Sequence, residues 1–378
     1  MFKIPLIIMS SIPISVIFGD KVNAWWFHNN GFNVEFWDIS PIYFSKERLD
    51  GYYSGSTDYK YIGPNHKTFY NKGLLFKAMS LLQNNTAIYY LSRTIYKLTD
   101  DDDILNYLYN KKLNLYFQVF TIFNEPSNLI DKIKNKIRTT KHRILNRNIY
   151  PTACFGSGLK TKLAIKEIYS ETQFVSIPSP RIYWERQDRV LDYDYIVFVD
   201  ESIGYEPDAK LLNLTSCTNL EGYHTRLNNL FDNIEKWTGL PIIVGASGKY
   251  KYVYNPFNRE MIYKKTFALI EHASLVIGHT SDALLHNVKC KKPMLLLSDI
   301  DFTKVKKDGF KALIISSINK IYLSNGFKQE DLESISLNKD DEYDIIERNY
   351  FREYGIDKDY KKIMAETFKK FYKINLEK

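Results

Sequence analysis

The stretch from Leu269 to Asp299, LIEHASLVIGHTSDALLHNVKCKKPMLLLSD, predicts the architecture of much of this chain. It contains two short apolar runs, Leu275 to Gly278 and Pro293 to Leu297, with a helical segment between them. Continuous apolar runs that are bounded by turn residues and separated by a helix indicate parallel strands covered on both faces. A further helix is expected to end at Glu271-His272-Ala273, just before the first run.

The polar turn His279-Thr280-Ser281-Asp282 falls at the carboxyl end of one strand and at the amino end of the next helix. Such a position offers free backbone N–H groups and the positive end of a helix dipole, which suits a phosphate. A second interpretation is that Thr280 or Ser281 only caps the helix. The residues of the turn are compatible with both.

The composition is that of a globular protein with anionic ligands. The chain has 378 residues, 44% hydrophobic and 25% charged, with a net charge of +8. This length fits two domains. The moderate positive charge and the lack of zinc-type Cys/His spacing or an RNP-like motif argue against nucleic acid as the partner. Three scattered cysteines, Cys154, Cys217 and Cys290, favour a reducing compartment.

The amino terminus begins with Lys3 and an apolar run from Ile4 to Phe18. Pro5 and Pro13 interrupt the run and no small-residue cleavage pattern follows, so we interpret it as a first strand and its loop, and not as a signal peptide. No stretch is long and apolar enough for a transmembrane helix. We therefore expect a cytoplasmic protein whose membrane association, if any, is peripheral.

The first half of the chain alternates between strand-like and helix-like segments, which predicts a parallel sheet with crossover helices. The predicted strands are Ile4–Met9, Phe32–Ile39, Ala87–Leu91 and Leu113–Phe120, and the predicted helices are Val22–Asn29, Lys72–Leu82 and Asp103–Asn110. Phe18 to Lys21 is expected to be a loop. The run Asp100 to Asp103 suits either a D-x-D metal site or a solvated helix start, and the second is favoured because no buried strand leads into it.

Two segments in the middle of the chain have other properties. Residues 129–148 combine isoleucines near helical spacing with seven basic residues, so they suit either a helix on an anionic membrane surface or an ordinary surface helix. The sequence Gly156-Ser157-Gly158 follows a short strand beginning near Pro151, and its glycines would allow a ligand to approach the backbone closely. A plain tight turn is the alternative.

A second series of strands and helices begins near Tyr193. Its predicted strands are Tyr195–Val199, Pro241–Val244 and the two described above, and its predicted helices are Tyr223–Thr238, ended by Gly239, and Phe257–Glu271. We predict an α/β fold with two Rossmann-like domains whose parallel sheets face a central cleft. The predicted limits are 1–190, 191–340 and a helical segment 341–378 that crosses back to the first domain.

Three loops of the second series lie at carboxyl ends of strands, where ligands bind to open parallel sheets. They are Asp200-Glu201, Ala246-Ser247-Gly248-Lys249-Tyr250 and His279-Thr280-Ser281-Asp282. A carboxylate here could deprotonate an acceptor hydroxyl, while Lys249 and the helix start stabilise a departing phosphate. The alternatives are that Asp200-Glu201 only caps a strand end and that His279 is a structural histidine.

The region from Tyr195 to Asp299 resembles the GT-B glycosyltransferases of bacterial surface polysaccharides, in particular the capsule and lipooligosaccharide group that includes sialyltransferase-like enzymes. The matching segments are Val199-Asp200-Glu201 to Pro207-Asp208, Tyr223-x-x-x-Leu227 with Phe231 to Glu235, Pro241 to Ala246, Leu269-Ile270, Val276 to Ser281 and Lys292-Pro293. The resemblance implies that Asp200 or Glu201 supplies the catalytic base and that Thr280-Ser281 holds the donor phosphate. Ser247-Gly248 stands where that group has a His-Pro pair that assists the leaving group.

The sequence thus predicts a GT-B glycosyltransferase that needs no metal and no cofactor, with a nucleotide-sugar as donor substrate and a lipid-linked glycan as acceptor. The second domain is expected to hold the donor and the first the acceptor, through Gly19, Asp20, Gly156, Ser157 and Gly158, with Asp20 as an alternative base. The rival interpretations are a nucleotide-sugar epimerase, a polyol-phosphate transferase, and a non-catalytic subunit that binds glycan or nucleotide.

Overall fold

The computed structural model describes most of the chain, in seven segments. These are residues 3–54, 60–91, 102–119, 151–182, 185–335, 340–353 and 359–376. The basic segment 129–148, for which a membrane-surface helix was one interpretation, lies outside the described residues.

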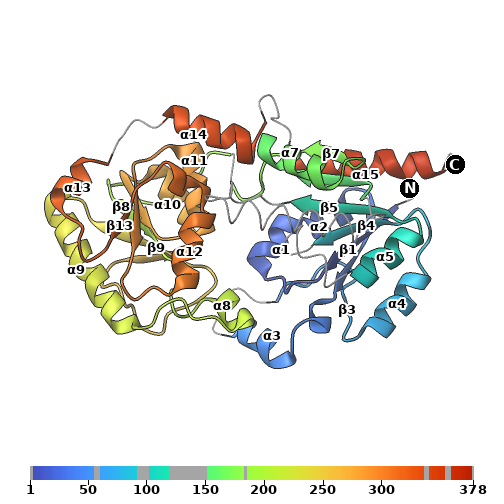
Figure 1. Ribbon diagram of the computed structural model, residues 1–378, viewed down its shortest axis with the longest axis horizontal. Coiled ribbons are helices and arrows are strands. Elements are labelled where there is room, and N and C mark those ends of the chain that lie inside the picture. The colour runs from blue at the N-terminus through green and yellow to red at the C-terminus, as the bar shows by residue number, and fades with distance from the viewer. Residues whose placement is uncertain are drawn as a thin grey trace. The chain divides into compact units, whose positions relative to one another are not determined.

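The chain forms two compact units, and each has its own parallel sheet. The first unit consists of Met1–Leu49, Tyr59–Pro180 and Arg348–Lys378, and the second of Asp50–Asp58 and Arg181–Glu347. The end of the chain thus belongs to the first unit, as Figure 1 shows by the red helix among blue and green elements.

The first unit has a seven-stranded sheet in the order β3-β2-β1-β4-β5-β6-β7, and all its described pairings are parallel. Its strands are β1 (Ile4–Ser10), β2 (Phe32–Asp38), β3 (Lys67–Thr68), β4 (Ala87–Leu91), β5 (Asn114–Val119), β6 (Ala153–Gly156) and β7 (Gln173–Ser176). Its helices are α1 (Val16–Val22), α2 (Ala24–Asn29), η1 (Ser40–Ile42), α3 (Lys46–Tyr53, whose residues from Asp50 on are assigned to the second unit), α4 (Lys72–Ser80), α5 (Asp102–Asn110), α7 (Gly158–Ile168) and α15 (Tyr360–Leu376). The π-helical turn η5 (Glu347–Phe351) leads into this unit.

Phe368 of α15 is fully buried in the core of the first unit. Its ring contacts five other aromatic rings in tilted or edge-to-face geometry, those of Phe27, Phe32, Tyr89, Tyr116 and Phe155. These rings come from α2, β2, β4, β5 and β6, so one side chain near the end of the chain joins much of one face of the sheet. Aromatic pairs of this geometry add to the free energy of area burial.

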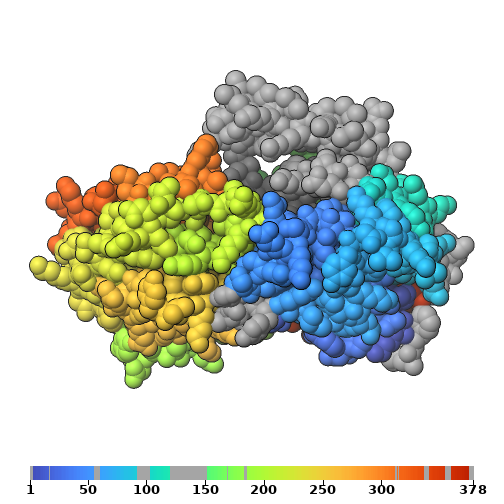
Figure 2. All heavy atoms as spheres, turned by 90° about the horizontal axis from the view of Figure 1, so that it is seen from below, coloured from blue at the N-terminus to red at the C-terminus, as the bar shows by residue number. Residues whose placement is uncertain are grey.

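The second unit has a six-stranded, all-parallel sheet in the order β10-β9-β8-β11-β12-β13. Its strands are β8 (Ile196–Val199), β9 (Ile242–Ala246), β10 (Met261–Tyr263), β11 (Leu275–Gly278), β12 (Met294–Ser298) and β13 (Ile321–Leu323). Its helices are α8 (Pro207–Leu212), α9 (Leu220–Thr238), α10 (Thr266–His272), η3 (Asp282–His286), α11 (Asn287–Cys290), α12 (Lys304–Ala312), η4 (Ile314–Ser317), α13 (Gln329–Glu333) and α14 (Asp340–Ile346). In Figure 2, residues 200–270 form one continuous yellow-green to amber surface on the visible face of this unit.

The fold class predicted from the sequence is confirmed, because each unit is an α/β layer structure around a parallel sheet. The apolar run Leu275–Gly278 is strand β11, with all four residues buried. Helix α9 ends at Gly239, which adopts the left-handed conformation with φ of 70° that glycine favours at this position. Asp102 and Asp103 begin α5, which agrees with the helix start expected for this run, while Asp100 and Asp101 lie outside the described residues.

The predicted loop Phe18–Lys21, which contains Gly19 and Asp20, is wrong because these residues lie in helix α1. The Ser15 side chain accepts a hydrogen bond from the Phe18 N–H and begins the helix, and Asn23, with φ of 60°, ends it. Glycine at position 19 lets helix α1 pack closely against Tyr61, since a Cβ at this position would lie only 2.0 Å from the Tyr61 ring.

Two predicted helices are wrong in extent or type, although the first ends near His272 as expected. Phe257–Glu271 contains strand β10 and only then the short helix α10, because Asn258 and Lys264 adopt positive φ, which a continuous helix does not permit. The helix expected after Asp282 is a 3-10 turn, η3, followed by the four-residue helix α11. It ends at Lys291, whose φ is 54°. The dipole of so short an element offers little to an anion.

Replacing Phe368 with Ala should destabilise the first unit by about 3–5 kcal/mol, because it removes a large ring from a packed core. Hydrogen exchange of the amides in β1, β4 and β5 measures this free energy directly. The matched control is Lys362→Ala on the exposed side of the same helix, which should change it by less than about 0.5 kcal/mol. Equal effects of the two substitutions would contradict a central role for the Phe368 ring.

Candidate functional site

The strand register of the second sheet brings three predicted loops to the same level. Val199 at the end of β8 pairs with Gly245 of β9 on one side and with Gly278 of β11 on the other. The chain therefore leaves these three strands side by side, after Val199, Ala246 and Gly278. The convergence expected at the carboxyl edge of this sheet is thus present within the second unit.

Asp200 joins the loops that follow β8 and β9. Its carboxylate accepts hydrogen bonds from the Ser202 N–H at 2.8 Å, the Ser247 N–H at 3.2 Å and the Tyr252 hydroxyl at 3.1 Å. The residue is only 4% exposed. Burial raises the pKa of this carboxyl group to about 6, although the three hydrogen bonds oppose the shift. Asp200 is therefore held in place by its own chain.

Glu201 joins the loops that follow β8 and β11 and contacts a lysine from α12. Its carboxylate accepts hydrogen bonds from the Thr280 N–H and from the Thr280 hydroxyl at 3.0 Å, and it pairs with Lys306 Nζ at 2.5 Å. Burial opposes ionisation, but Lys306 and the other donors hold the pKa of Glu201 below its ordinary value. Glu201 is thus an ionised carboxylate bound by three donors, which we call the anion corner (Glu201, Thr280 and Lys306).

Lys306 was missed by the sequence analysis. Its side chain is 9% exposed and lies in the first turn of α12, where the Thr303 hydroxyl caps the helix by accepting from the Lys306 N–H. Lys304, Lys306 and Lys307 look alike in the sequence, and Lys304 is 86% exposed. Thr303 could have indicated the start of the helix. Which lysine faces inward depends on how α12 packs.

His279 is a structural histidine, as one interpretation of the sequence held. The ring is fully buried, and its Nδ1 lies 2.5 Å from the Leu297 carbonyl while its Nε2 lies 2.9 Å from the Tyr223 hydroxyl. A carbonyl only accepts, so Nδ1 carries the proton and Nε2 accepts from Tyr223. Burial lowers the pKa of His279 to about 4, which keeps it neutral.

The rest of the polar turn is engaged by its own chain. The Ser281 hydroxyl accepts from the Ala283 N–H at 3.2 Å and caps η3, as the second interpretation of this turn proposed. Asp282 is exposed and pairs with Arg181 at 3.3 Å. The sequence predicts that the turn from His279 to Asp282 holds a phosphate. In this structure Thr280 is the residue of the turn that binds an anion, because its N–H and hydroxyl donate to the Glu201 carboxylate.

Some residues of the loop after β9 contact one another, and others contact α8 and the turn before it. Ala246 is buried at the end of the strand, and Ser247 Oγ accepts from the Lys249 N–H at 3.3 Å across Gly248. Lys249 Nζ pairs with Asp208 of α8 at 3.0 Å, and its side chain is 44% exposed. The Tyr250 ring stacks on Tyr205 with 4.6 Å between centroids. Lys249 and Tyr250 therefore contact α8 and the turn before it.

Of the predicted acceptor residues of the first unit, the three glycines and Ser157 have packing roles in this structure. A Cβ at Gly158, whose φ is 76°, would lie 2.4 Å from the backbone of Asn349 and Tyr350, so the close approach expected for a ligand is made by the chain itself. A Cβ at Gly156 would lie 2.8 Å from Phe174, and Ser157 is fully buried. Gly19 packs against Tyr61, whereas Asp20 is exposed on α1.

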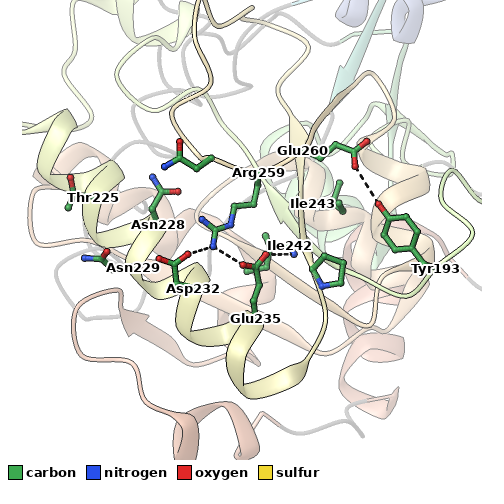
Figure 3. A pocket seen from close by; sticks show the side chains of 12 residues that line it. Tyr193, Thr225, Asn228, Asn229, Asp232, Glu235, Ile242, Ile243, Arg259 and Glu260 are labelled. Carbon is green, nitrogen blue, oxygen red and sulfur yellow. Dashed lines mark hydrogen bonds and ion pairs between the residues drawn. The ribbon is translucent and has the colours of Figure 1, made fainter.

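A polar depression of about 730 Å³ lies at the amino edge of the second sheet, beside Pro241 and Ile242. Figure 3 shows Arg259 between two carboxylates of α9, and its guanidinium pairs with Asp232 at 2.5 Å and with Glu235 at 2.7 Å. This depression contains none of the residues of the anion corner.

The sequence matches no family model and no curated protein, but solved structures share the fold. MurG of Acinetobacter baumannii superposes with a TM-score of 0.50 at 9% identity, over 97% of this chain and 99% of that one. The galactoside α-2,3-sialyltransferase of Photobacterium phosphoreum gives 0.50 at 11%, over 86% and 100%. The calicheamicin glycosyltransferase CalG4 gives 0.51 at 7%, over 92% and 93%. The chain has the GT-B fold.

Among the described residues, no helix combines the length and apolar character that a bilayer crossing requires.

The raised pKa of Asp200 predicts a specific dependence of stability on pH. Between pH 4 and pH 6 the unfolded chain ionises this carboxyl group while the folded chain keeps its proton, so its contribution to stability falls as the pH rises. A shift of about two pKa units corresponds to about 3 kcal/mol. The difference in unfolding free energy between the wild type and Asp200→Asn, measured with urea, should decrease by this amount over that window and stay constant above it. If the unfolding free energies of the wild type and Asp200→Asn changed in parallel with pH, the pKa of Asp200 would not be raised.

The Glu201–Lys306 pair predicts a strong coupling. Lys306→Met leaves a buried carboxylate without its counterion and should cost about 3–5 kcal/mol, whereas Glu201→Gln together with Lys306→Met should recover most of this loss. Urea unfolding of the wild type, both single variants and the double variant gives the coupling energy. Additive effects would show that the two side chains do not interact.

Proposed function

We propose that this protein is a glycosyltransferase that moves a sugar from a nucleotide-sugar donor to a glycan acceptor. The GT-B fold supports this, because the solved structures that share it include a sialyltransferase and the calicheamicin glycosyltransferase. Fold alone does not define a reaction. The residues of the second unit carry the rest of the argument.

The observation that carries the proposal is the anion corner. A backbone N–H, a hydroxyl and an ammonium group, from Thr280 and Lys306, converge on one carboxylate at the carboxyl edge of a parallel sheet. Charged oxygens bind such donors strongly, and a phosphate presents the same kind of oxygen as a carboxylate. Ligands of open α/β sheets bind at this edge. We assign the corner to a phosphate of the donor.

In this proposal Glu201 is the internal anion that holds Lys306 and Thr280 until a phosphate takes its place. When the acceptor oxygen attacks, the bond between the anomeric carbon and the phosphate oxygen breaks and its electron pair stays on the phosphate. Lys306 and Thr280 then stabilise the charge on that phosphate. Their positions are set in advance by Glu201, so in this proposal the Glu201 side chain moves aside while the donors stay in place.

We assign Asp200 a positioning role in place of the base role expected from the sequence. Its carboxylate accepts three hydrogen bonds from the chain and orders the Ser247 backbone, which supports a donor-side function for the loop from Ala246 to Tyr250. Glu201, with its lowered pKa, is a weak base. The acceptor proton is then taken by a group of the first unit, for which exposed Asp20 is the candidate.

The biological setting that we propose is the synthesis of a bacterial surface polysaccharide, with a lipid-linked glycan as acceptor. The region from Tyr195 to Asp299 resembles glycosyltransferases of bacterial surface polysaccharides, which supports this setting. The basic sequence of residues 129–148 supports attachment to the inner face of an anionic membrane. The protein would act without a catalytic metal, because Lys306 supplies positive charge and Thr280 supplies hydrogen bonds to the leaving phosphate.

One observation favours a second function, that of a non-catalytic subunit that binds a nucleotide or glycan. Both carboxylates of the predicted catalytic pair, Asp200 and Glu201, are fully engaged by their own chain. A binding protein needs the anion corner but no base.

The proposal predicts that the anion corner binds nucleotide phosphate. In a thermal-shift screen of nucleotides and nucleotide-sugars, at least one should stabilise the protein. Lys306→Met should weaken binding of that nucleotide about ten- to a hundredfold, because a charge-assisted hydrogen bond contributes about 1.5–3 kcal/mol. Glu201→Gln should tighten it, since a competing carboxylate is removed. The matched control is exposed Lys236→Met in α9, which should leave binding unchanged.

A turnover assay distinguishes a glycosyltransferase from a non-catalytic binding subunit. Incubation of the stabilising nucleotide-sugar with lipid-linked glycans should release free nucleoside mono- or diphosphate and extend the glycan if the protein is a transferase. Binding without release would support the binding subunit. A nucleotide that binds equally well to Lys306→Met would remove the basis of both.

A further inference from the structure

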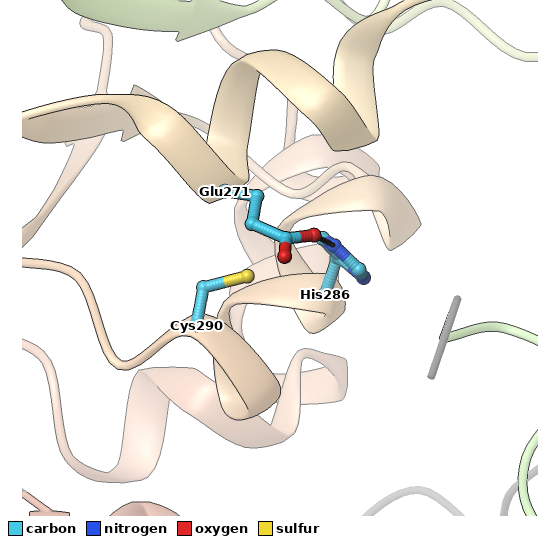
Figure 4. A group of neighbouring side chains, drawn as sticks. All are labelled: Glu271, His286 and Cys290. Atoms are coloured by element: carbon cyan, nitrogen blue, oxygen red, sulfur yellow. Dashed lines mark ion pairs between the residues drawn. The ribbon is translucent and has the colours of Figure 1, made fainter. Parts of the chain in front are cut away.

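A cluster of three potential metal ligands lies in the second unit, outside the anion corner. The carboxylate of Glu271, the imidazole of His286 and the thiol of Cys290 have one ligand atom each within 4.8 Å of the others. Figure 4 shows the three side chains pointing toward one another from two neighbouring helical segments. Glu271 and Cys290 stand shortly before strands β11 and β12, so they lie toward the amino edge of the sheet, opposite the anion corner.

The local structure sets up the cluster. His286 ends η3 and Cys290 ends α11, and the spacing of four residues across this continuous helical segment places both side chains on one face. Glu271 is in the last turn of α10, which packs against η3 and α11. The Gln187 N–H donates to Glu271 Oε2 at 3.2 Å and orients the carboxylate, as an outer partner does at a metal site.

His286 indicates that the cluster is incomplete without a ligand. Its ring is fully buried, and neither nitrogen has a hydrogen-bond partner among the residues that the structure describes. The nearest carboxylate oxygen, on Glu271, lies 3.7 Å from Nε2, beyond hydrogen-bond distance. Buried polar atoms are almost always satisfied, because an unsatisfied one costs about 1–3 kcal/mol. A metal ion bound to Nε2 would remove this penalty at that nitrogen.

We propose that Glu271, His286 and Cys290 bind a zinc ion or a similar divalent transition metal. One sulfur, one nitrogen and one oxygen suit zinc, whose ligand bonds of about 2.0–2.3 Å place two ligand atoms of a tetrahedron about 3.5 Å apart. The three side chains therefore need to close by roughly 1 Å. Cys290 binds as the thiolate, its proton passing to solvent, and water completes the tetrahedron. The ion would tie α10 to the segment that follows the anion corner.

Lys289 is the competitor for this ion. Its ammonium group lies 3.3 Å from the same Glu271 oxygen, and it also donates to the Glu185 carbonyl at 2.7 Å. A divalent ion would displace it from Glu271, and the lysine would keep its second partner. Replacing Lys289 should therefore strengthen metal binding, whereas a cluster that only packs the protein would show no such effect.

The test uses the purified full-length protein, stripped with chelator and titrated with Co²⁺ as the spectroscopic probe. One equivalent should bind, with a thiolate-to-cobalt charge-transfer band and tetrahedral d–d absorption, and Zn²⁺ should abolish both. Cys290→Ser should remove the charge-transfer band, and Glu271→Gln should weaken binding at least about tenfold. Lys289→Gln should tighten binding severalfold. The matched control is Cys217→Ser in the same unit, which should retain the full signal.

Lack of a stoichiometric Co²⁺ complex in both the wild type and Lys289→Gln would overturn the proposal. So would a thiolate band that survives in Cys290→Ser or is lost in Cys217→Ser. Circular dichroism of each metal-free variant shows that it is folded. The readout is independent of glycosyl transfer, so it stands apart from the proposed function.

Discussion

The second unit depends on the pairing of Glu201 with Thr280 and Lys306. Parallel strands of equal register end at the same level, so β8, β9 and β11 bring their polar loops together at one edge. The carboxylates that follow β8 are buried there and need donors. Asp200 obtains them from the loop after β9, and Glu201 from the loop after β11 and from α12. Two adjacent acids thus fix three loops and a helix at the edge where such sheets bind ligands.

The same contacts explain why the two acids differ. Asp200 accepts its hydrogen bonds from neutral donors, so burial dominates and raises its pKa, whereas the ammonium group of Lys306 keeps Glu201 ionised. In the proposed reaction the two acids, which differ in pKa, have different roles. Asp200 orders the backbone around Ser247, and Glu201 keeps the ammonium group of Lys306 and the N–H and hydroxyl of Thr280 ready for a phosphate. Preorganised donors of this kind contribute much of the catalytic effect where charge develops on a leaving group.

The segment from Leu269 to Asp299 connects two sets of contacts at opposite edges of one sheet. Its polar turn after β11 contributes Thr280 to the anion corner, while Glu271, His286 and Cys290 meet near the other edge. A metal at that edge would restrain η3 and α11, the elements that follow Thr280 directly. The sequence contains no zinc-type spacing, because Glu271, one of the three proposed ligands, lies on another helix, fifteen residues before His286 in the chain.

The sequence by itself determined the fold class, most strands and the loops that converge, because apolar runs and turn residues are local signals that burial requires. It also placed Asp200, Glu201 and Thr280 at one edge. It missed the α1 helix over Gly19 and the strand β10, where capping and side-chain packing outweighed the apolar pattern. Only the tertiary structure decided which groups pair, since Glu201 meets Thr280 and Lys306 across 79 and 105 residues. Such pairings follow from strand register and helix packing, which no local pattern specifies.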